Sequence, residues 1–279
     1  MRIDFLGGTD TVTGSKYLLS HSGRQLLVDC GLFQGVKHLR LRNREPLPVD
    51  AAAIDAVLLT HAHIDHSGFI PRLMQLGFTG RVYFTEAIYK QCELLLPDSG
   101  HLQEEEAEFA NRHGHSRHKP ALPLYTEEDA HTALKHFVPL PFDSECSPWK
   151  GWSWRLSRAG HILGACSPRI EWLGGSILFS GDLGRNDDLI MRAPVPSSPA
   201  DDVVIESTYG DRRHPVGDTL EQLAAVVNRT AVRGGVVVVP AFAQMQGVFT
   251  LIPRDGGLSC KWKVLFTLFA SAHCQGYIC

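Results

Sequence analysis

Short apolar runs bounded by turn residues recur along the chain and predict where its strands and helices lie. Runs of about four to eight residues, rich in β-branched and aromatic side chains, are typical of strands. They predict strands at Arg2–Leu6, Lys16–Ser20, Gln25–Asp29, Ala56–Thr60, Arg81–Thr85, Trp152–Ser157, Arg169–Leu173, Ser176–Ser180, Val203–Glu206 and Gly235–Pro240. Apolar residues at helical spacing predict helices at Ser67–Leu76, Glu86–Leu96, Gln103–Arg112, Glu127–Phe137 and Thr219–Val232. Strands that first meander and then alternate with helices indicate an α/β sandwich of sheets covered by helices.

The composition is that of a globular protein of 279 residues, 44% of them hydrophobic and 20% charged. The formal net charge is −3 with mixed signs, so bulk charge gives a nucleic-acid substrate no support. Seven cysteines without CxxC spacing favour reduced thiols over a disulfide framework. We find no secretory signal and no apolar stretch near the roughly 20 residues of a membrane span. We therefore expect a cytoplasmic protein without membrane contact.

Four metal-binding side chains follow directly after the predicted strand Ala56–Thr60. They are His61, His63, Asp65 and His66. Zinc binds imidazole nitrogens and carboxylate oxygens. Residues two apart on an extended backbone project to one side, so His61 and His63 can face a common point. A chance cluster of polar loop residues is the alternative.

Three more polar residues stand at loops or strand ends. His161 has small neighbours, which allow its backbone a close approach to other groups. Asp182 follows the strand Ser176–Ser180, and Asp29 ends the strand Gln25–Asp29. Each could be an ordinary loop or turn residue. Asp29 could instead orient metal-binding histidines through hydrogen bonds.

The order and setting of these residues resemble the four successive motifs of the metallo-β-lactamase superfamily. The resemblance implies a metallo-β-lactamase αββα sandwich in the α/β class. It also implies that His61, His63 and His161 bind one Zn²⁺, that Asp65 and His66 bind a second, and that Asp182 bridges the two.

A second resemblance is to the β-CASP branch of that superfamily, whose members are nucleases acting on RNA or DNA. Val204–Asp211 is similar to the first extra motif of the branch, and Val239–Ala243 is similar to a later one. Leu96–Glu106 is similar to bacterial RNA exonucleases and processing endonucleases. The resemblance implies that Glu206 joins Asp65 and Asp182 as a catalytic residue. The alternative is a strand-end carboxylate that only caps a turn.

From about Gln244 onward the similarity is lost. We assign residues 1–200 to a metallo-β-lactamase domain, 201–243 to the start of a β-CASP region and 244–279 to a divergent tail. Residues 192–199 are Pro-rich and form the best linker. His273 lies in a setting similar to the general-acid motif of the family, but its distance from Glu206 favours coincidence. The last ligand of the second zinc has no candidate, so we expect a weakened second site and a weak or inactive nuclease.

The resulting interpretation is a dinuclear-zinc ribonuclease that hydrolyses RNA phosphodiester bonds through a metal-bound hydroxide. Single-stranded RNA is the expected partner, and homo-oligomer formation is left open. Arg185, Arg212, Arg213 and His214 could contact phosphates, or could form a solvated charged face. Two alternatives are a hydrolase of thioesterase or lactonase type, against which the Glu206 motif argues, and a truncated, catalytically impaired zinc-binding fragment.

Overall fold

The computed structural model describes residues 1–279 except for residues 117, 189, 214–216, 238–240, 243–267 and 270–279. The chain divides into two compact units, one of which is Met1–Glu206 and the other Ser207–Cys274. The first unit holds both large β-sheets, and its boundary lies six residues beyond the boundary we assigned at residue 200.

A six-stranded sheet is built from the amino-terminal half of the first unit, with strands in the order β1-β2-β3-β4-β5-β6. The strands are β1 (Arg2–Gly7), β2 (Lys16–His21), β3 (Arg24–Val28), β4 (Ala56–Leu58), β5 (Arg81–Thr85) and β6 (Phe137–Leu140). The pairs β1–β2 and β2–β3 are antiparallel, whereas β3 to β6 run parallel. Parallel neighbours need long crossovers, and helices supply them. These helices are α1 (Lys37–Arg42), the 3-10 turn η1 (Ala51–Ala53), α2 (Ile64–Ser67), α3 (Ile70–Gln75), α4 (Glu86–His113) and α5 (Glu127–Leu134).

A five-stranded sheet follows, in the order β11-β10-β9-β8-β7. Its strands are β7 (Glu145–Trp149), β8 (Trp152–Arg158), β9 (Cys166–Trp172), β10 (Gly175–Phe179) and β11 (Asp202–Val204). Hairpins join β7 to β10, and β11 pairs with β10 in parallel.

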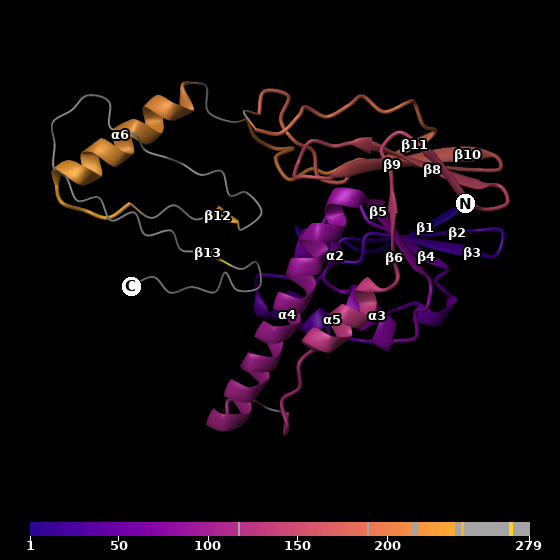
Figure 1. Ribbon diagram of the computed structural model, residues 1–279, viewed down its shortest axis with the longest axis horizontal. Coiled ribbons are helices and arrows are strands. Elements are labelled where there is room, and N and C mark those ends of the chain that lie inside the picture. The colour runs from indigo at the N-terminus through magenta and orange to yellow at the C-terminus, as the bar shows by residue number, and fades with distance from the viewer. Residues whose placement is uncertain (117, 189, 214–216, 238–240, 243–267, 270–279) are drawn as a thin grey trace. The chain divides into compact units, whose positions relative to one another are not determined.

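Alternating side chains divide the apolar residues of the first sheet between two cores. Leu18, Leu27 and Val57 point to a core shared with α2 to α5. Their neighbours Leu19, Leu26 and Leu58 point the other way, to a core shared with the five-stranded sheet. This period of two is what a strand imposes when both sheet faces are covered. The layers can be followed in Figure 1, where α3, α4 and α5 lie across the first sheet from the second. The predicted α/β sandwich of sheets and helices is confirmed.

The helix predictions were wrong at one proline. The pattern predicted two helices, Glu86–Leu96 and Gln103–Arg112, but α4 is a single helix that passes through Pro97. An interior proline removes one backbone hydrogen bond and costs about 3 kcal/mol. Leu96, Pro97 and Gly100 are nevertheless buried, and α4 packs along α5. Burial of this stretch offsets the local cost.

Other predicted bounds also differ from the structure. The helix predicted at Ser67–Leu76 is divided into α2 and α3 around Gly68 and Phe69. Strands β6 and β7 and helix α1 were not predicted, because their sequences carry prolines or strong charge. The helix predicted at Glu127–Phe137 ends at Leu134, although its Thr126 cap is confirmed as a capping box with Asp129.

The second unit contains helix α6 (Thr219–Val232), which has the predicted bounds, and the short parallel pair β12 (Ala241–Phe242) and β13 (Leu268–Phe269). Asp218 caps α6 by accepting from two backbone N–H groups. The strand predicted at Gly235–Pro240 is wrong for residues 235–237, and its remaining residues lie outside the described ones. In the described part of the chain, no helix has the length and apolarity that crossing a membrane requires.

Candidate metal centre

The loop after β4 carries the densest group of polar side chains in the first unit. The chain leaves the buried strand at Leu58 and enters α2 at Ile64, so His61 and His63 lie on the connection. Asp65 and His66 lie within the single turn of α2. His61 is fully buried, whereas Asp65 is partly open to solvent. The local fold therefore presents these side chains at the carboxyl end of β4.

Side chains from three loops converge on one point. His61 Nε2 lies 3.0 Å from His63 Nδ1, and His161 Nε2 lies 3.3 Å from the same His63 atom. Asp182 Oδ2 is 3.6 Å from His61 Nε2 and 3.5 Å from His161 Nε2. One atom from each of the four residues lies within 4.8 Å of the other three, so the group could hold a metal ion.

These separations can be compared with what zinc requires. Zinc–nitrogen bonds of about 2.0–2.1 Å at tetrahedral angles place neighbouring ligand atoms about 3.4 Å apart. The observed separations of 3.0–3.6 Å lie around that value. Three imidazoles and one carboxylate also form a donor set that zinc accepts. Donor chemistry and geometry therefore both fit a metal ion.

The second oxygen of Asp182 faces a different group. Asp182 Oδ1 lies 3.4 Å from His66 Nε2, which in turn lies 3.8 Å from Asp65 Oδ2. The Ser15 hydroxyl approaches the same His66 nitrogen at 3.5 Å. One carboxylate thus lies between two clusters of ligand-type atoms.

Asp29 connects the two clusters through hydrogen bonds to Thr60 and His66. Its Oδ2 accepts a hydrogen bond from the Thr60 hydroxyl at 2.8 Å and lies 2.8 Å from His66 Nδ1. Its Oδ1 accepts from the Thr60 backbone N–H, also at 2.8 Å. Because Thr60 gives its one hydroxyl proton to Asp29, its oxygen accepts from His61 Nδ1–H at 3.0 Å. That tautomer leaves the Nε2 lone pair of His61 directed toward Asp182 and His63.

Asp29 adopts a backbone conformation that few non-glycine residues adopt, with φ at +57°. Gly31, two residues after Asp29, lies against the metal-binding loop, where an added Cβ would meet the Asp65 carbonyl oxygen at 1.5 Å. Backbone hydrogen bonds join the same two segments, from Cys30 N to His66 O and from Leu32 N to Ile64 O. Close backbone contact therefore fixes the position of α2.

The loops that carry His161 and Asp182 are joined to each other. Gly160 and Leu183 form an isolated antiparallel bridge, and a Cβ on Gly184 would lie 1.9 Å from Gly160 O. The sequence-based inference that small neighbours allow His161 a close approach is consistent with this contact. Glu206 contributes from the end of β11, where its Oε1 accepts from Leu183 N at 2.8 Å. Glu206 therefore holds the residue next to Asp182.

Two imidazoles of the first cluster, those of His61 and His63, are held neutral. Burial, together with repulsion from neighbouring imidazoles, lowers the pKa of His61 well below its usual value. The same causes lower the pKa of His63 to about 3. Neutral imidazole is the form that binds a metal.

His66 behaves in the opposite way. Burial lowers its pKa, but attraction and a hydrogen bond from Asp29, with further attraction from Asp65 and Asp182, together raise it to about 10. The pKa of Asp182 is raised by burial, against the attraction of His66 and His161. The second cluster thus holds a proton that a cation would displace.

The residues predicted to contact substrate belong to different units of the chain. Arg185 is exposed three residues after Asp182. Arg212 and Arg213 belong to the second unit, where the Arg212 guanidinium pairs with Asp211. His214 and His273 lie outside the described residues. Sequence reasoning missed Thr60 and Ser15, and the place of Thr60 directly before His61 was the one available signal.

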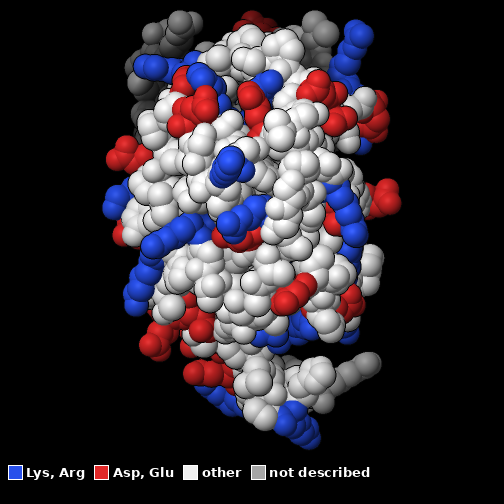
Figure 2. All heavy atoms as spheres, turned by 90° about the vertical axis from the view of Figure 1, so that its right-hand side faces the viewer, with Lys and Arg blue, Asp and Glu red and all other residues white. Residues whose placement is uncertain are grey.

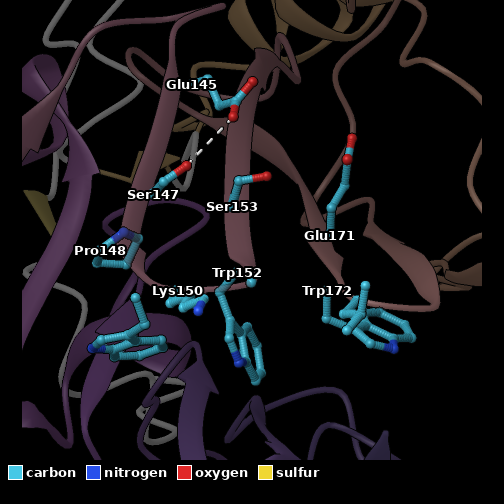
Figure 3. Close-up of a pocket in the computed structure, with 11 residues that line it drawn as sticks. Glu145, Ser147, Pro148, Lys150, Trp152, Ser153, Glu171 and Trp172 are labelled. Atoms are coloured by element: carbon cyan, nitrogen blue, oxygen red, sulfur yellow. Dashed lines mark hydrogen bonds between the residues drawn. The ribbon is translucent and has the colours of Figure 1, made fainter.

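A hollow of about 480 Å³ lies at the other end of β8 from His161 (Figure 3). It is lined by Trp149, Trp152 and Trp172, with Lys150 at the β7–β8 turn. The two ends of β8 are about 20 Å apart at strand geometry. None of the predicted site residues lines this hollow, so we place the chemistry at the histidine cluster.

Comparison with known proteins identifies the family of the chain. The family described as the metallo-beta-lactamase superfamily matches residues 10–228. The chain therefore belongs to the metallo-beta-lactamase superfamily, as its motifs predicted.

Three relatives show which members of the superfamily this chain is similar to. Ribonuclease TTHA0252 of Thermus thermophilus is 37% identical over 246 residues, which are 87% of this chain and 52% of that protein. Transcription termination factor FttA of Methanocaldococcus jannaschii is 30% identical over 87% of this chain and 37% of its own length. Cleavage and polyadenylation specificity factor 73 of Drosophila melanogaster is 30% identical over 87% of this chain and 34% of its own.

These matches confirm the resemblance to β-CASP-like ribonucleases. The chain spans about half of the first relative (52%) and about a third of the other two (37% and 34%).

Proposed function

We propose that this chain is a dinuclear-zinc hydrolase that cleaves phosphodiester bonds in RNA. The observation that carries the proposal is the position of Asp182, whose two carboxylate oxygens face two different clusters. Oδ2 faces His61 and His161 at 3.6 and 3.5 Å, and Oδ1 faces His66 at 3.4 Å. A carboxylate between two ligand groups is what a pair of bridged metal ions needs.

The first zinc ion would be held by His61, His63, His161 and Asp182. The low pKa values of His61 and His63 keep their lone pairs available at neutral pH. Thr60 holds His61 in the required tautomer. Little has to rearrange before the ion binds, which supports tight binding at this position.

The second zinc ion would be held by Asp65, His66 and Asp182. Asp29 orients His66 from the far side of its ring at 2.8 Å. Hydrogen bonds of this kind raise the basicity of a metal-binding imidazole and fix its direction. Three protein ligands suffice for a catalytic zinc ion, so this position can be both occupied and open to substrate.

When bound, the two ions would lower the pKa of a water molecule and neutralise charge that develops on the phosphate. The chain supplies the arrangement of ligands around that chemistry. Asp65 and Asp182 are charged groups at the edge that is partly open to solvent. Glu206 positions the Asp182 loop through Leu183 N and completes the proposed catalytic residues.

The choice of RNA as substrate comes from the relatives, of which the first is named a ribonuclease. Single-stranded RNA is the form we propose, with Arg185, Arg212 and Arg213 as phosphate contacts. The formation of a homo-oligomer is not needed for this chemistry.

The test uses the purified 279-residue chain with labelled single-stranded RNA, with bound zinc measured in parallel. Cleavage of RNA with two zinc ions per chain is the expected result, and the rate tests the prediction of weak activity. Hydrolysis of a thioester or lactone without RNA cleavage would identify a different hydrolase of this fold. Bound zinc without turnover of either substrate would contradict the proposal and indicate an impaired zinc-binding protein.

A further inference from the structure

Helix α1 carries charge of one sign only. Four of its six residues are Lys37, His38, Arg40 and Arg42. No Asp or Glu occurs anywhere between Asp29 and Glu45. The face in Figure 2 shows basic and acidic side chains interspersed, and the whole chain has a net charge of −3. The stretch from Cys30 to Arg44 thus carries basic residues and no carboxylate.

The basic side chains of α1 lie at the surface. Lys37, His38 and Arg40 are exposed, as are the apolar side chains of Val36 and Leu41. Like charges three or four residues apart on a helix repel one another. Lys37 and Arg40 have this spacing, so their positive charges lie on the same side of the helix.

Helix α1 is connected to the metal-binding loop through Phe33 and Leu32. The Asn43 side chain accepts from Phe33 N and donates to Phe33 O, both at 2.8 Å. The Arg42 guanidinium lies over the Phe33 ring at 4.0 Å. Leu32, the preceding residue, bonds through its N–H to Ile64 O beside Asp65.

The anchoring limits how far α1 can be from the metal-binding loop. Five extended residues reach at most about 18 Å, which bounds the distance from Leu32 to Lys37. Phosphates of a stacked strand repeat about every 3.4 Å. The basic helix is thus within a few nucleotides of a bond held at the metal centre.

A second cation strengthens the positive field at this place. The buried ammonium of Lys16 lies 4.6 Å from the centre of the Phe33 ring and donates to the Gly31 carbonyl. Burial lowers the pKa of Lys16 to about 8, with attraction from Cys30 acting against it and a smaller repulsion from Arg42 adding to it. In the described part of the chain, no carboxylate lies within ion-pairing distance of Lys16, Lys37 or Arg42. Two cations, Lys16 and Arg42, therefore lie against the Phe33 ring, in the segment that is hydrogen-bonded to the metal-binding loop.

We propose that α1 is a docking surface for the sugar-phosphate backbone of single-stranded RNA, next to the metal centre. This inference rests on the proposed function and adds a substrate-binding element to it. A cleaved polymer must extend beyond the bond at the metal ions, and α1 lies within its reach. Exposed Val36 and Leu41 offer apolar contacts for bases between the phosphate contacts.

The test measures binding of a fluorescein-labelled oligouridylate with phosphorothioate linkages to zinc-loaded protein, by fluorescence anisotropy at several salt concentrations. The variant K37Q/R40Q is expected to bind roughly tenfold more weakly at low salt. Each contact to a single strand contributes about 0.7 to the slope of log affinity against log salt, so the slope should fall by about 1.4.

The matched control is K135Q/K150Q, which removes the same charge from two exposed residues, one directly after α5 and one in the β7–β8 turn. It should bind RNA as the wild type does. Equal weakening in both double variants would show that net charge alone governs binding and would overturn the proposal. K37R/R40K keeps both charges and should bind normally, so loss of binding there would also contradict a charge-based surface.

Two further results separate this inference from the proposed function. Zinc content should be the same in all variants, which verifies that the metal centre is folded. If the wild type hydrolyses bis(p-nitrophenyl) phosphate but neither binds nor cleaves RNA, the RNA substrate is wrong and α1 has no such role. If the wild type cleaves RNA and K37Q/R40Q binds it as tightly, only the role of α1 is wrong.

Discussion

The two clusters on either side of Asp182 differ in how ready they are for a metal ion. His61 and His63 are held neutral by burial and by mutual repulsion, with the pKa of His63 lowered to about 3. His66 is held protonated by its carboxylate neighbours, with a pKa raised to about 10. Histidine is thus neutral at position 61 and protonated at position 66, although the centres of the two rings are only 4.1 Å apart.

The difference in histidine pKa between the two clusters comes from the positions of the carboxylates. In the first cluster, the partner of His61 Nδ1 is the Thr60 hydroxyl, a neutral group. In the second, the partner of His66 Nδ1 is the buried carboxylate of Asp29. A neutral partner fixes a tautomer, whereas a charged partner also raises basicity. The first cluster is therefore a preformed site, and the second exchanges a proton for its ion.

The largest expected effect is that of His61→Ala. It removes a ligand from the centre of the first cluster, so we expect loss of the first zinc ion and a fall in activity of roughly 10³-fold or more. Elemental analysis and RNA cleavage rates measure both effects. His131→Ala, on the exposed side of α5, is the control and should retain zinc. Normal zinc content in His61→Ala would contradict the ligand assignment.

The second-largest expected effect is that of Asp29→Asn, which keeps the shape of the side chain and removes its negative charge. Loss of a carboxylate that supports a metal-binding histidine typically costs about 10–100-fold in affinity. We expect the larger loss at the second position, because only His66 contacts Asp29 directly, and calorimetric zinc titration measures it. Asparagine tolerates positive φ, so strain is not introduced. Asp143→Asn is the control, because Asp143 also has positive φ, at +59°, but lies away from the cluster. An equal loss at both metal positions would remove the contrast between the clusters.

The pH dependence of zinc binding separates the clusters without any substitution. His63 has a pKa of about 3 and is unprotonated near neutral pH, so protonation of His63 should not weaken the first affinity between about pH 6 and 8. His66 has a pKa of about 10, so zinc displaces its proton over this whole range. The second affinity should rise roughly tenfold per pH unit, because one proton is released. Competition with a chelator at several pH values measures both. Parallel slopes for the two ions would show that the clusters do not differ in protonation.

Much of this site was readable from the sequence, because its ligands follow strand ends in a recognisable order. His61, His63, His161 and Asp182 were named from that order, and the structure brings them together. The six-stranded sheet was also largely readable, since its apolar runs alternate between two cores. The local sequence pattern was sufficient to predict a strand or a ligand wherever that feature depends on a single segment of the chain.

The remaining features depend on contacts between distant segments. The Thr60 hydroxyl connects Asp29 to His61 only once β3 and β4 are paired. The continuity of α4 through Pro97 depends on packing against α5, which no local window contains. Helix α1 was missed because its charges obscure any apolar period, although the absence of carboxylates around it was visible.

The smallest expected effect on the metal ions is that of Glu206→Ala. Glu206 belongs to neither cluster, so this variant tests whether a residue outside them affects zinc binding. Glu206 accepts from Leu183 N and is not within either ligand group, so both zinc ions should remain bound. The lost hydrogen bond frees the backbone next to Asp182. A hydrogen bond to a charged group contributes about 1.5–3 kcal/mol, so activity should fall roughly tenfold or somewhat more. Glu108→Ala, at an exposed position on α4, should change neither quantity. Zinc loss in Glu206→Ala equal to that in His61→Ala would mean that Glu206 maintains the ligands themselves. A full rate with full zinc would mean that the Leu183 contact only caps a turn.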